Sequence, residues 1–292
     1  NIIVYETDDL LLNDQNQKSF SELCDATSVS TEYLKNEYSN YAKNIYVLKN
    51  ALSNRFLQKA HQKNNFNIRK FDSNITLAFF SGSKNHNDDF KIIEKSLLSI
   101  LKKNAHVNLI ICGKIRFSNE FYLFKDNFEY VEFLPYTDFI EIYKRVDIVL
   151  VPLIDNKFNH AKSELKFIEA GAFGVVTIAS FTETYNSIIK NKENGILIYK
   201  NEEWIYLIQE LINNPDFTNK LSKSAYKSVM KSYTSDLRAD DYLNFIKDIS
   251  NKIKRKPNYL LFTYYFVAAY LHFSYMNFKR FIVYFLNPIY KN

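Results

Sequence analysis

Short apolar runs alternate with amphipathic segments along most of the chain. Runs rich in β-branched and aromatic residues predict buried strands at residues 2–5, 26–29, 45–48, 75–80, 107–112, 130–134, 147–151, 175–179 and 196–199. Apolar positions three and four apart predict helices between them at residues 19–24, 31–38, 88–103, 138–145, 163–172, 183–190 and twice within 202–233. Repeated strand–helix units of this kind build an α/β fold with a doubly wound parallel sheet.

Differences in pattern along the chain predict its domain organisation. Residues 70–235 carry the clearest alternation and are expected to form the main α/β domain. The first strand is apolar throughout and needs a neighbour on each side, and the chain starts without methionine. We therefore interpret residues 1–60 as the end of an N-terminal domain that begins outside this chain, together with its linker. Residues 50–74 are polar and irregular, as expected of an interdomain connection.

The last part of the chain, residues 236–292, is expected to be a helical tail. Residues 251–256 are basic, and residues 259–290 are crowded with aromatic side chains. The many tyrosines suit a membrane interface better than a hydrocarbon core. Basic residues beside an aromatic helix are typical of a protein bound peripherally to an anionic membrane, here through residues 251–292. Packing of a terminal helix on another domain explains the same pattern equally well.

Composition narrows the functional class. With 47% hydrophobic and 24% charged residues, the chain of 292 residues is globular. Its net charge of +6 is mild, and Lys and Arg are scattered among acids, so we expect no nucleic acid partner. Cys24 and Cys112 lie far apart in apolar settings and predict buried thiols in a reducing, cytoplasmic compartment. A turn at a strand end explains Asp8–Asp9, so we predict no metal site.

Glycine is rare, with five in 292 residues. Where glycine is scarce, we expect it at positions that do not tolerate a side chain, because φ is positive or because the backbone approaches a ligand. This expectation applies to Gly82, Gly113, Gly171 and Gly174. An ordinary turn explains Gly195, which follows Glu-Asn in the sequence.

Residues 163–180 contain the most informative spacing in the chain. Ser163, Lys166 and Glu169 follow at intervals of three, which aligns them along one side of the predicted helix. As the N-cap, Ser163 would leave the amides of the first turn facing a ligand, and Lys166 adds a positive charge. A carboxylate one turn deeper can accept hydrogen bonds from a diol. The arrangement therefore suits a phosphate joined to a diol, as in a nucleotide sugar.

The ends of three neighbouring strands carry further candidate groups. In an open parallel sheet, ligands bind where strands end and loops lead into helices. Taken singly, each candidate has an ordinary structural explanation as a cap, a solvated ion pair or a polar loop residue. Taken together, we expect them to line one crevice: Gly82, Ser83, Lys84 and His86 after the first strand, Gly113 after the second, and Leu134 with Pro135 after the third.

These segments resemble a known family. Residues 79–83 (Phe-Phe-Ser-Gly-Ser), the pattern at residues 163–174 and the strand end at 178–180 look like the C-terminal, donor-binding domain of a GT-B glycosyltransferase of the GT4 type. The resemblance covers about residues 75–233. Residues 5–10 and 29–34 resemble the closing segments of the same family's N-terminal domain.

The resemblance implies a role for each matched position. Glu169 corresponds to the second glutamate of the family's paired-glutamate motif and is expected to bind the ribose. The loop of Gly82, Ser83 and Lys84 is expected to approach the diphosphate, with Lys166 on its other side. We expect Lys166 and Glu169 to be the catalytic residues. The remaining candidates divide into donor-binding residues, which are His86, Lys162 and Ser163, and nucleoside-binding residues, which are Gly113, Leu134 and Pro135.

One position departs from the family pattern. The first glutamate of the pair would fall at Ala161. Its contact to the donor sugar is then absent or supplied by Asn159, His160 or Lys162. Donor identity and activity both depend on which of these holds.

The predicted function is transfer of a sugar from a nucleotide-sugar donor to a saccharide or lipid-linked acceptor in surface polysaccharide biosynthesis. The resemblance implies a retaining reaction without metal or other cofactor. The chain would be cytoplasmic or peripheral on the inner face of the membrane. Two alternatives remain open, a non-catalytic nucleotide-sugar-binding module and a sugar-nucleotide epimerase, of which the second is expected to carry more acids and histidines in its cleft.

Overall fold

The computed structural model describes residues 2–10, 15–63, 74–82, 86–132 and 134–253. The predictions for Ser83, Lys84 and the tail beyond residue 253 therefore lie outside the described residues. The chain divides into two compact units. The first contains residues 1–49, 161–163 and 238–292, and the second contains residues 50–160 and 164–237.

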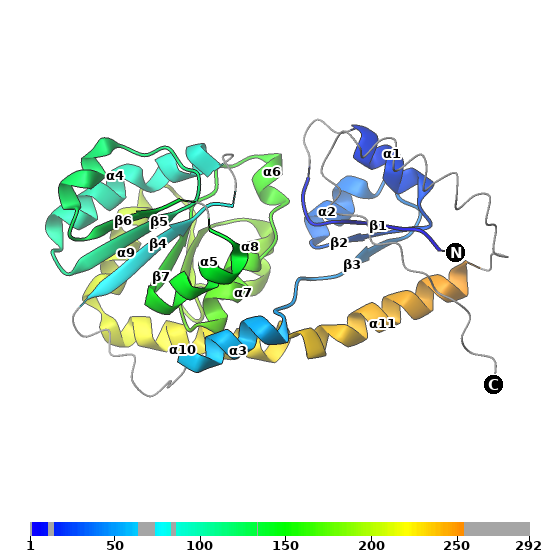
Figure 1. Cartoon of the computed structure of the whole chain (residues 1–292). Helices are drawn as coiled ribbons and strands as arrows, with labels where there is room; N and C mark the ends of the chain where they lie inside the picture. Colours follow the sequence, from blue (N-terminus) through cyan, green and yellow to red (C-terminus); the bar gives the residue numbers. More distant parts are fainter. Residues whose placement is uncertain (1, 11–14, 64–73, 83–85, 133, 254–292) are drawn as a thin grey trace. The chain divides into compact units, whose positions relative to one another are not determined.

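A six-stranded, all-parallel sheet forms the centre of the second unit (Figure 1). Its spatial order is β6-β5-β4-β7-β8-β9, so the direction of winding reverses between β4 and β7. The predicted doubly wound α/β fold is confirmed. The strands are β4 (Ile75–Phe80), β5 (Val107–Cys112), β6 (Phe128–Val131), β7 (Ile148–Val151), β8 (Val176–Ser180) and β9 (Ile196–Ile198).

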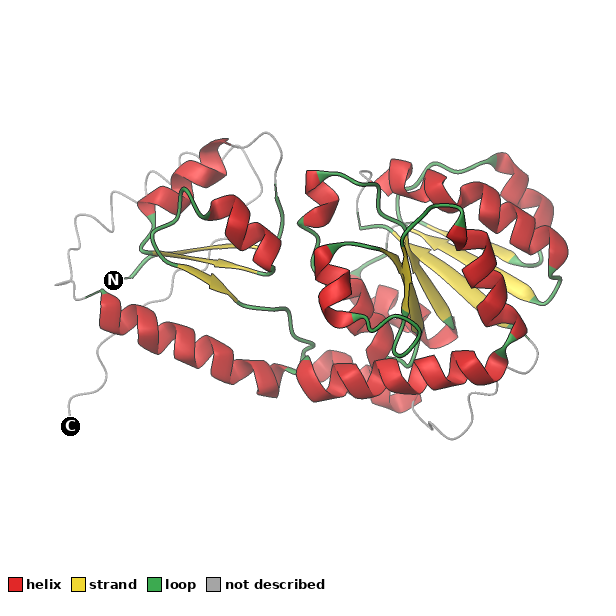
Figure 2. Ribbon diagram, turned by 180° about the vertical axis from the view of Figure 1, so that it is seen from behind, coloured by secondary structure: helices red, strands yellow, loops and turns green. Residues whose placement is uncertain are grey.

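Helices cover both faces of this sheet (Figure 2). Because side chains alternate along a strand, Leu77 and Phe79 of β4 enter one core while Ala78 and Phe80 enter the other. Burial on both faces explains the nearly continuous apolar runs of the strands. The helical segments are α3 (Asn54–Lys63), α4 (Asn87–Lys103), η2 (Asn119–Phe124), α5 (Tyr136–Ile142), η3 (Tyr143–Arg145), α6 (Lys157–His160), α7 (Leu165–Ala172), α8 (Glu183–Ile188), α9 (Glu203–Asn213) and α10 (Pro215–Ser232).

The structure differs from the prediction in residues 50–74 and after Val131. The expected irregular segment at 50–74 contains the helix α3, because Phe56, Leu57 and Ala60 share one buried face among polar residues. Strand β6 ends at Val131, not at residue 134, because its pairing with β5 stops where β5 ends, at Cys112. Leu134 and Pro135 lead into α5 instead.

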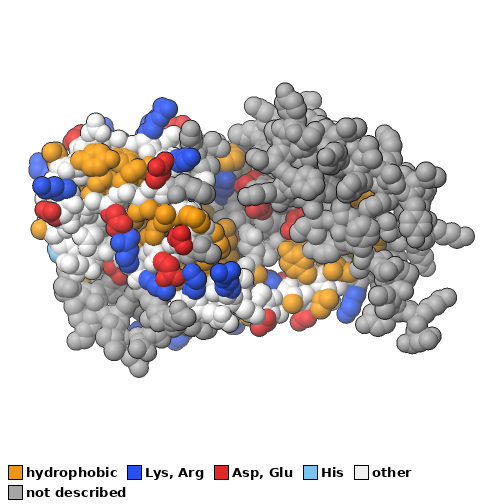
Figure 3. All heavy atoms as spheres, in the orientation of Figure 1, with side chains coloured by type: hydrophobic (Ala, Val, Ile, Leu, Met, Phe, Trp, Pro, Cys, Tyr) orange, Lys and Arg blue, Asp and Glu red, His pale blue; other side chains and the backbone are white. Residues whose placement is uncertain are grey.

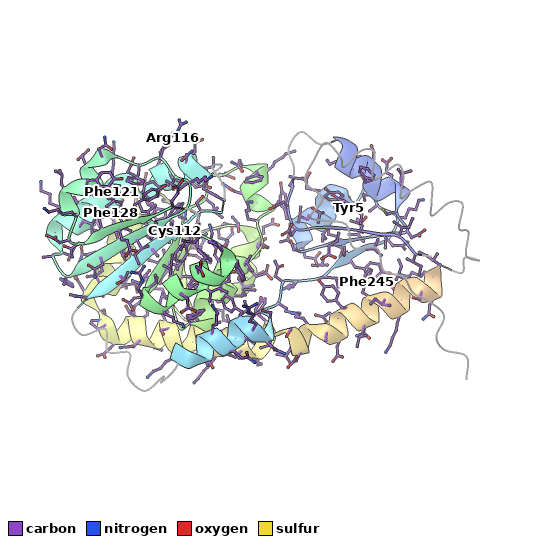
Figure 4. All side chains as sticks on the ribbon, in the orientation of Figure 1. Tyr5, Cys112, Arg116, Phe121, Phe128 and Phe245 are labelled. Atoms are coloured by element: carbon purple, nitrogen blue, oxygen red, sulfur yellow. The ribbon has the colours of Figure 1, made fainter. Side chains whose placement is uncertain are left out.

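A smaller parallel sheet, in the order β1-β2-β3, forms the first unit. Apolar residues from α1, α2 and the strands build one cluster, which contains Tyr5. Phe245 and Ile249 of the helix α11 build another with β2 and the end of β3, and Figure 4 labels Tyr5 and Phe245. The elements are β1 (Val4–Thr7), α1 (Gln15–Leu23), β2 (Ala26–Val29), α2 (Glu32–Tyr38), β3 (Ile45–Val47) and α11 (Ser235–Lys252).

The described surface is mixed in charge. On the face drawn in Figure 3, the described Lys and Arg side chains are interspersed with Asp and Glu and form no continuous basic stripe. Within the same described residues, no helix combines the length and the apolar character needed to cross a bilayer.

Candidate functional site

The strand order of the second unit defines one place for a ligand. In an open parallel sheet, the carboxyl ends of the two strands that flank the reversal point form a crevice. Those strands are β4, which leads through Ser81 and Gly82 toward α4, and β7, which leads toward α6. Most of the predicted site residues of this unit come directly after β4, β5 or β6. Lys166 and Glu169 lie in the helix α7, which comes after β7 and α6 in the chain.

Glu169 is the most strongly perturbed acid at this edge. It lies in α7, which packs on β7, β8 and α10, and only 4% of its surface is exposed. The hydroxyl of Tyr136 donates to its Oε1 atom and that of Tyr143 to its Oε2 atom, each at 3.0 Å. Burial raises the pKa of Glu169 to about 7, although both hydroxyls and the charge of Lys166 act to lower it. The carboxyl group therefore titrates near neutral pH.

The two tyrosines come from the segment after β6. Tyr143 is completely buried, and burial together with the neighbouring Glu169 raises its pKa well above the usual value, which keeps it a hydrogen-bond donor. Tyr136 is the first residue of α5, is 55% exposed, and directly follows the predicted residues Leu134 and Pro135. The sequence prediction missed both tyrosines. The only signal for them was their position after the strand whose loop it had already selected.

Lys166 lies one turn before Glu169. Its Nζ atom is 5.9 Å from the centre of the Phe79 ring, near the end of β4, which is within range of a cation–π interaction. The structure therefore brings Lys166 to the end of the strand whose following loop was predicted to bind a diphosphate.

The start of α7 differs from the prediction. The helix begins at Leu165 with Glu164 as its N-cap, because the carbonyl of Glu164 already accepts from the amides of two residues in the first turn. Ser163 is therefore not the N-cap, and it groups with the first unit. Lys162 belongs to that unit too, where its Nζ atom donates to Asp9 at 3.1 Å. Ala161 is 1% exposed in the apolar cluster of the same unit.

His86 lies at the entrance to α4 and is 7% exposed. Its Nδ1 atom is 2.8 Å from Oδ2 of Asp89, which is itself 2% exposed. The other oxygen of Asp89 accepts from the backbone amide of Ile154 and from the side-chain amide of Asn159, both after β7. Asp89 thus joins the segments that follow β4 and β7. The sequence prediction selected His86 but missed Asp89, although their spacing of three at a helix start was a signal.

The glycines at the edge have different requirements. Gly113 has φ +111°, and an added Cβ atom would overlap the carbonyl oxygen of Ser81, so glycine is needed where the β4 and β5 loops meet. Cys112, labelled in Figure 4, marks this end of β5. A Cβ atom added at Gly82 would meet no described atom within 4 Å. Nothing in the described part of the chain therefore requires glycine at position 82.

Both cysteines are buried and unpaired, as predicted. Burial raises the pKa of Cys24 to about 12 and that of Cys112 to about 11. Neither thiol is suited to act as a nucleophile near neutral pH.

The first unit contains a pocket of about 480 Å³. Residues from β3 and α11 line it, and side chains of both charges face it. The predicted site residues are not among those that line this pocket, and its mixed lining does not indicate one class of ligand.

Comparisons with known proteins agree with the geometry of the second unit. The sequence model of the family "Glycosyl transferases group 1" matches residues 61–228, more than half of the chain. An alpha-monoglucosyldiacylglycerol synthase from Acholeplasma laidlawii is 28% identical over 94 residues, which cover 32% of this chain and 23% of that relative.

Two solved structures share the arrangement of elements at low sequence identity. Anabaena Alr3699/HepE in complex with UDP and glucose superposes with a TM-score of 0.63 at 13% identity, over 84% of this chain and 71% of that chain. A mutant of S. aureus TarM in complex with Fondaparinux, alpha-GlcNAc-glycerol and UDP gives a TM-score of 0.63 at 14% identity, over 82% of this chain and 50% of that chain. At these identities the likeness concerns the fold alone.

Proposed function

Because this chain belongs to the glycosyl transferases group 1 and has their GT-B type of α/β fold, we propose that it transfers a sugar from a nucleotide-sugar donor to a saccharide or lipid-linked acceptor. We place this transfer in surface polysaccharide biosynthesis, with retention of configuration and without a metal. The observation that carries the proposal is the pair of Lys166 and Glu169 on α7, within the segment that matches the family: Lys166 lies over Phe79 near the end of β4, and Glu169 is a buried carboxylate with a raised pKa.

Binding of the nucleoside is assigned to Glu169 and the neighbouring loops. A carboxylate has about four acceptor positions, and the two tyrosine hydroxyls use two of them. Two ribose hydroxyls can therefore still donate to Glu169 in its ionised form. Gly113 follows β5, and Leu134 and Pro135 follow β6. These three residues are proposed to contact the rest of the nucleoside.

Stabilisation of the leaving group is assigned to cations at the ends of β4 and α7. Negative charge develops on the nucleoside diphosphate as the bond to the sugar breaks, and fixed positive groups lower that barrier. Lys166 supplies such a charge. Lys84 and His86 are proposed to act from the loop after β4, and Gly82 and Ser83 of the same loop are proposed to approach the phosphates. In a front-face displacement, the acceptor oxygen bonds to the anomeric carbon while the departing phosphate oxygen takes the acceptor's proton.

The acceptor and the location are proposed from one relative and from the sequence of the tail. The Acholeplasma relative is named as a synthase of a glucosylated diacylglycerol, which supports a lipid-linked acceptor. The basic and aromatic residues 251–292 support peripheral binding to an anionic membrane from the cytoplasmic side.

Lys162 and Ser163 are proposed to contact the donor sugar.

A second candidate is a non-catalytic nucleotide-sugar-binding module. Ala161 favours it, because a buried methyl group at that position cannot replace the carboxylate that the family pattern places there. Binding would then persist without transfer.

Calorimetric titration with UDP, GDP, ADP and their sugar conjugates tests the proposal. We expect one nucleotide series to bind, and Lys166→Ala and Glu169→Ala each to weaken it by about tenfold, as loss of one charge-assisted hydrogen bond would. Lys102→Ala is the matched control, because Lys102 is exposed at the opposite end of α4. Equal affinity in all four proteins would contradict the site. Binding without transfer or hydrolysis of the sugar nucleotide would favour the non-catalytic module.

A further inference from the structure

The two tyrosines that hold Glu169 differ in their surroundings. Tyr143 is completely buried, and its ring centre lies 4.8 Å from that of Phe80 in the core. Tyr136 is 55% exposed, and its ring centre lies 6.4 Å from that of Phe56, near the upper limit for an aromatic contact. Its hydroxyl nevertheless reaches the 4% exposed Glu169 and donates to Oε1 at 3.0 Å. Core packing therefore fixes Tyr143 more tightly than Tyr136.

Tyr136 is the member of this pair whose side chain reaches the surface. A ligand hydroxyl that donates to the second acceptor position of Oε1 lies about 3 Å from that oxygen. The Tyr136 hydroxyl lies 3.0 Å from the same oxygen, so the ligand oxygen and this hydroxyl are at most about 6 Å apart. A diol bound by Oε1 of Glu169 is therefore a close neighbour of Tyr136.

The ionisation of Glu169 decides how many ligand hydroxyls it can accept. A protonated carboxyl group turns one oxygen into a donor, so it cannot accept from two tyrosines and two ligand hydroxyls at once. Burial raises the pKa of Glu169 to about 7. The hydrogen bonds from Tyr136 and Tyr143 act to lower this pKa, as does the charge of Lys166. Tyr185 of α8 also lies near, and it stays neutral because burial and neighbouring carboxyl groups raise its pKa.

The other elements packed on α7 are apolar or neutral where their contacts are known. Strands β7 and β8 contain only apolar residues, serine and threonine. Helix α10 meets α7 at Gly171, where Ala225 and Val229 lie closest. The tyrosine hydroxyls and Lys166 are therefore the groups that favour the carboxylate form of Glu169.

We propose that Tyr136 is a positioning residue of the nucleoside site: its hydroxyl orients Oε1 of Glu169 and favours the carboxylate, so that a ribose hydroxyl can occupy the remaining acceptor position. This inference rests on the proposed function and adds a dependence of nucleotide affinity on Tyr136 and on pH. Tyr136 acts through Glu169. Affinity rises as the pH increases through about 7, because the ribose binds the ionised form.

Tyr136→Phe tests the proposal by removing one hydroxyl and keeping the ring. Loss of a hydrogen bond to a charged group should disfavour ionisation of Glu169 about tenfold. At about pH 7 the ionised fraction then falls from about one half to about one tenth. We expect the affinity for UDP, GDP or ADP, whichever binds the wild type in calorimetry, to fall about fivefold at this pH. At about pH 9 Glu169 is ionised in both proteins, and the affinities should agree within about threefold.

The comparison at two pH values distinguishes positioning from a general structural role. Titration of the nucleotide itself cancels in the ratio of the two affinities, because both proteins bind the same ligand. A matched control is Tyr206→Phe, since Tyr206 is 73% exposed in α9. We expect this control to bind like the wild type at both pH values. An equal loss in Tyr136→Phe at pH 7 and pH 9 would overturn the inference, because ionisation of Glu169 would then play no part.

A double-mutant cycle tests whether Tyr136 acts through Glu169. In a Glu169→Ala background, Tyr136→Phe should change nucleotide affinity less than about twofold. Carbon NMR of the Glu169 carboxyl group should show a higher pKa in Tyr136→Phe than in the wild type. Additive losses in the cycle, or an unchanged pKa of Glu169, would overturn the inference.

Two further outcomes keep the test decisive. If Tyr136→Phe does not fold, proton NMR of the wild type replaces it: above the pKa of Glu169, the Tyr136 hydroxyl proton should stay protected from exchange when nucleotide is bound, and loss of that protection would overturn the inference. If the wild type binds none of the nucleotides, the proposed function fails and the inference fails with it. Binding that Glu169→Ala weakens and Tyr136→Phe leaves unchanged at pH 7 would overturn only the inference.

Discussion

Substitution of Glu169 by glutamine should change the pH dependence of stability in a defined direction. Burial raises the pKa of Glu169 from 4.5 to about 7. At 1.36 kcal/mol for each pH unit, ionisation of this carboxyl group lowers the free energy of unfolding by about 3 kcal/mol. The group is 4% exposed, so solvent screening reduces this value little. Between pH 4.5 and 7 the folded state keeps a proton that the unfolded state has lost, and stability therefore falls as pH rises.

The single tryptophan provides the assay. Trp204 is completely buried in α9, so its fluorescence reports unfolding of the second unit, which contains Glu169. Urea unfolding is measured at intervals from about pH 4.5 to 7.5 for the wild type and for Glu169→Gln. The neutral amide can still accept from one tyrosine hydroxyl and donate to the other. We expect the variant to gain about 3 kcal/mol relative to the wild type across this range.

A control and a refuting result define the test. Glu210→Gln is the control for loss of an exposed carboxylate, paired with Lys192, from the same unit. A difference from the wild type that stays constant with pH for Glu169→Gln would refute the reasoning, because Glu169 would then titrate alike in the folded and unfolded chains. A difference with the opposite sign would mean that the tyrosine hydrogen bonds outweigh desolvation.

Three further predictions concern four positions other than Glu169. Gly113→Ala should destabilise the second unit by at least about 2 kcal/mol, measured by tryptophan fluorescence in urea, because φ is +111° and the new methyl group would overlap Ser81. Cys24 and Cys112 should react with an aromatic disulfide reagent at about pH 8 at least about a hundredfold more slowly than free cysteine, and at the ordinary rate in urea, because burial raises the pKa of both thiols. Thr182→Ala should lower the unfolding free energy by about 1 kcal/mol in the same urea assay, because its hydroxyl caps α8.

Local pattern was sufficient to predict most strands of the sheet. The bounds of β4 and β5 agree with the prediction to the residue, because both strands are buried on two faces and are bounded by polar residues or glycine. The local sequence pattern did not predict the end of a strand where pairing with a neighbouring strand decides that end. The apolar residues after Val131 look like more strand, but β5 offers no further partner beyond Cys112.

The site shows the same division between local and distant information. Lys166 and Glu169 are three residues apart in one helix, so spacing alone was enough to select them together. The partners of Glu169 lie 26 and 33 residues away, and no local pattern pairs a carboxylate with a hydroxyl at such distances. Asp89 was missed for a related reason, since two of its partners lie 65 and 70 residues later.

The tyrosines explain how a carboxylate can stay buried in this site and remain useful. An exposed glutamate would lose most of its affinity for a diol to competing water, whereas a buried acceptor makes stronger hydrogen bonds. Tyr136 and Tyr143 satisfy one acceptor position on each oxygen and leave a second position open. They only partly offset desolvation, since the pKa of Glu169 still rises to about 7. A ligand that donates two hydroxyls stabilises the ionised form further, so the loss of stability in the empty site favours occupation by such a ligand.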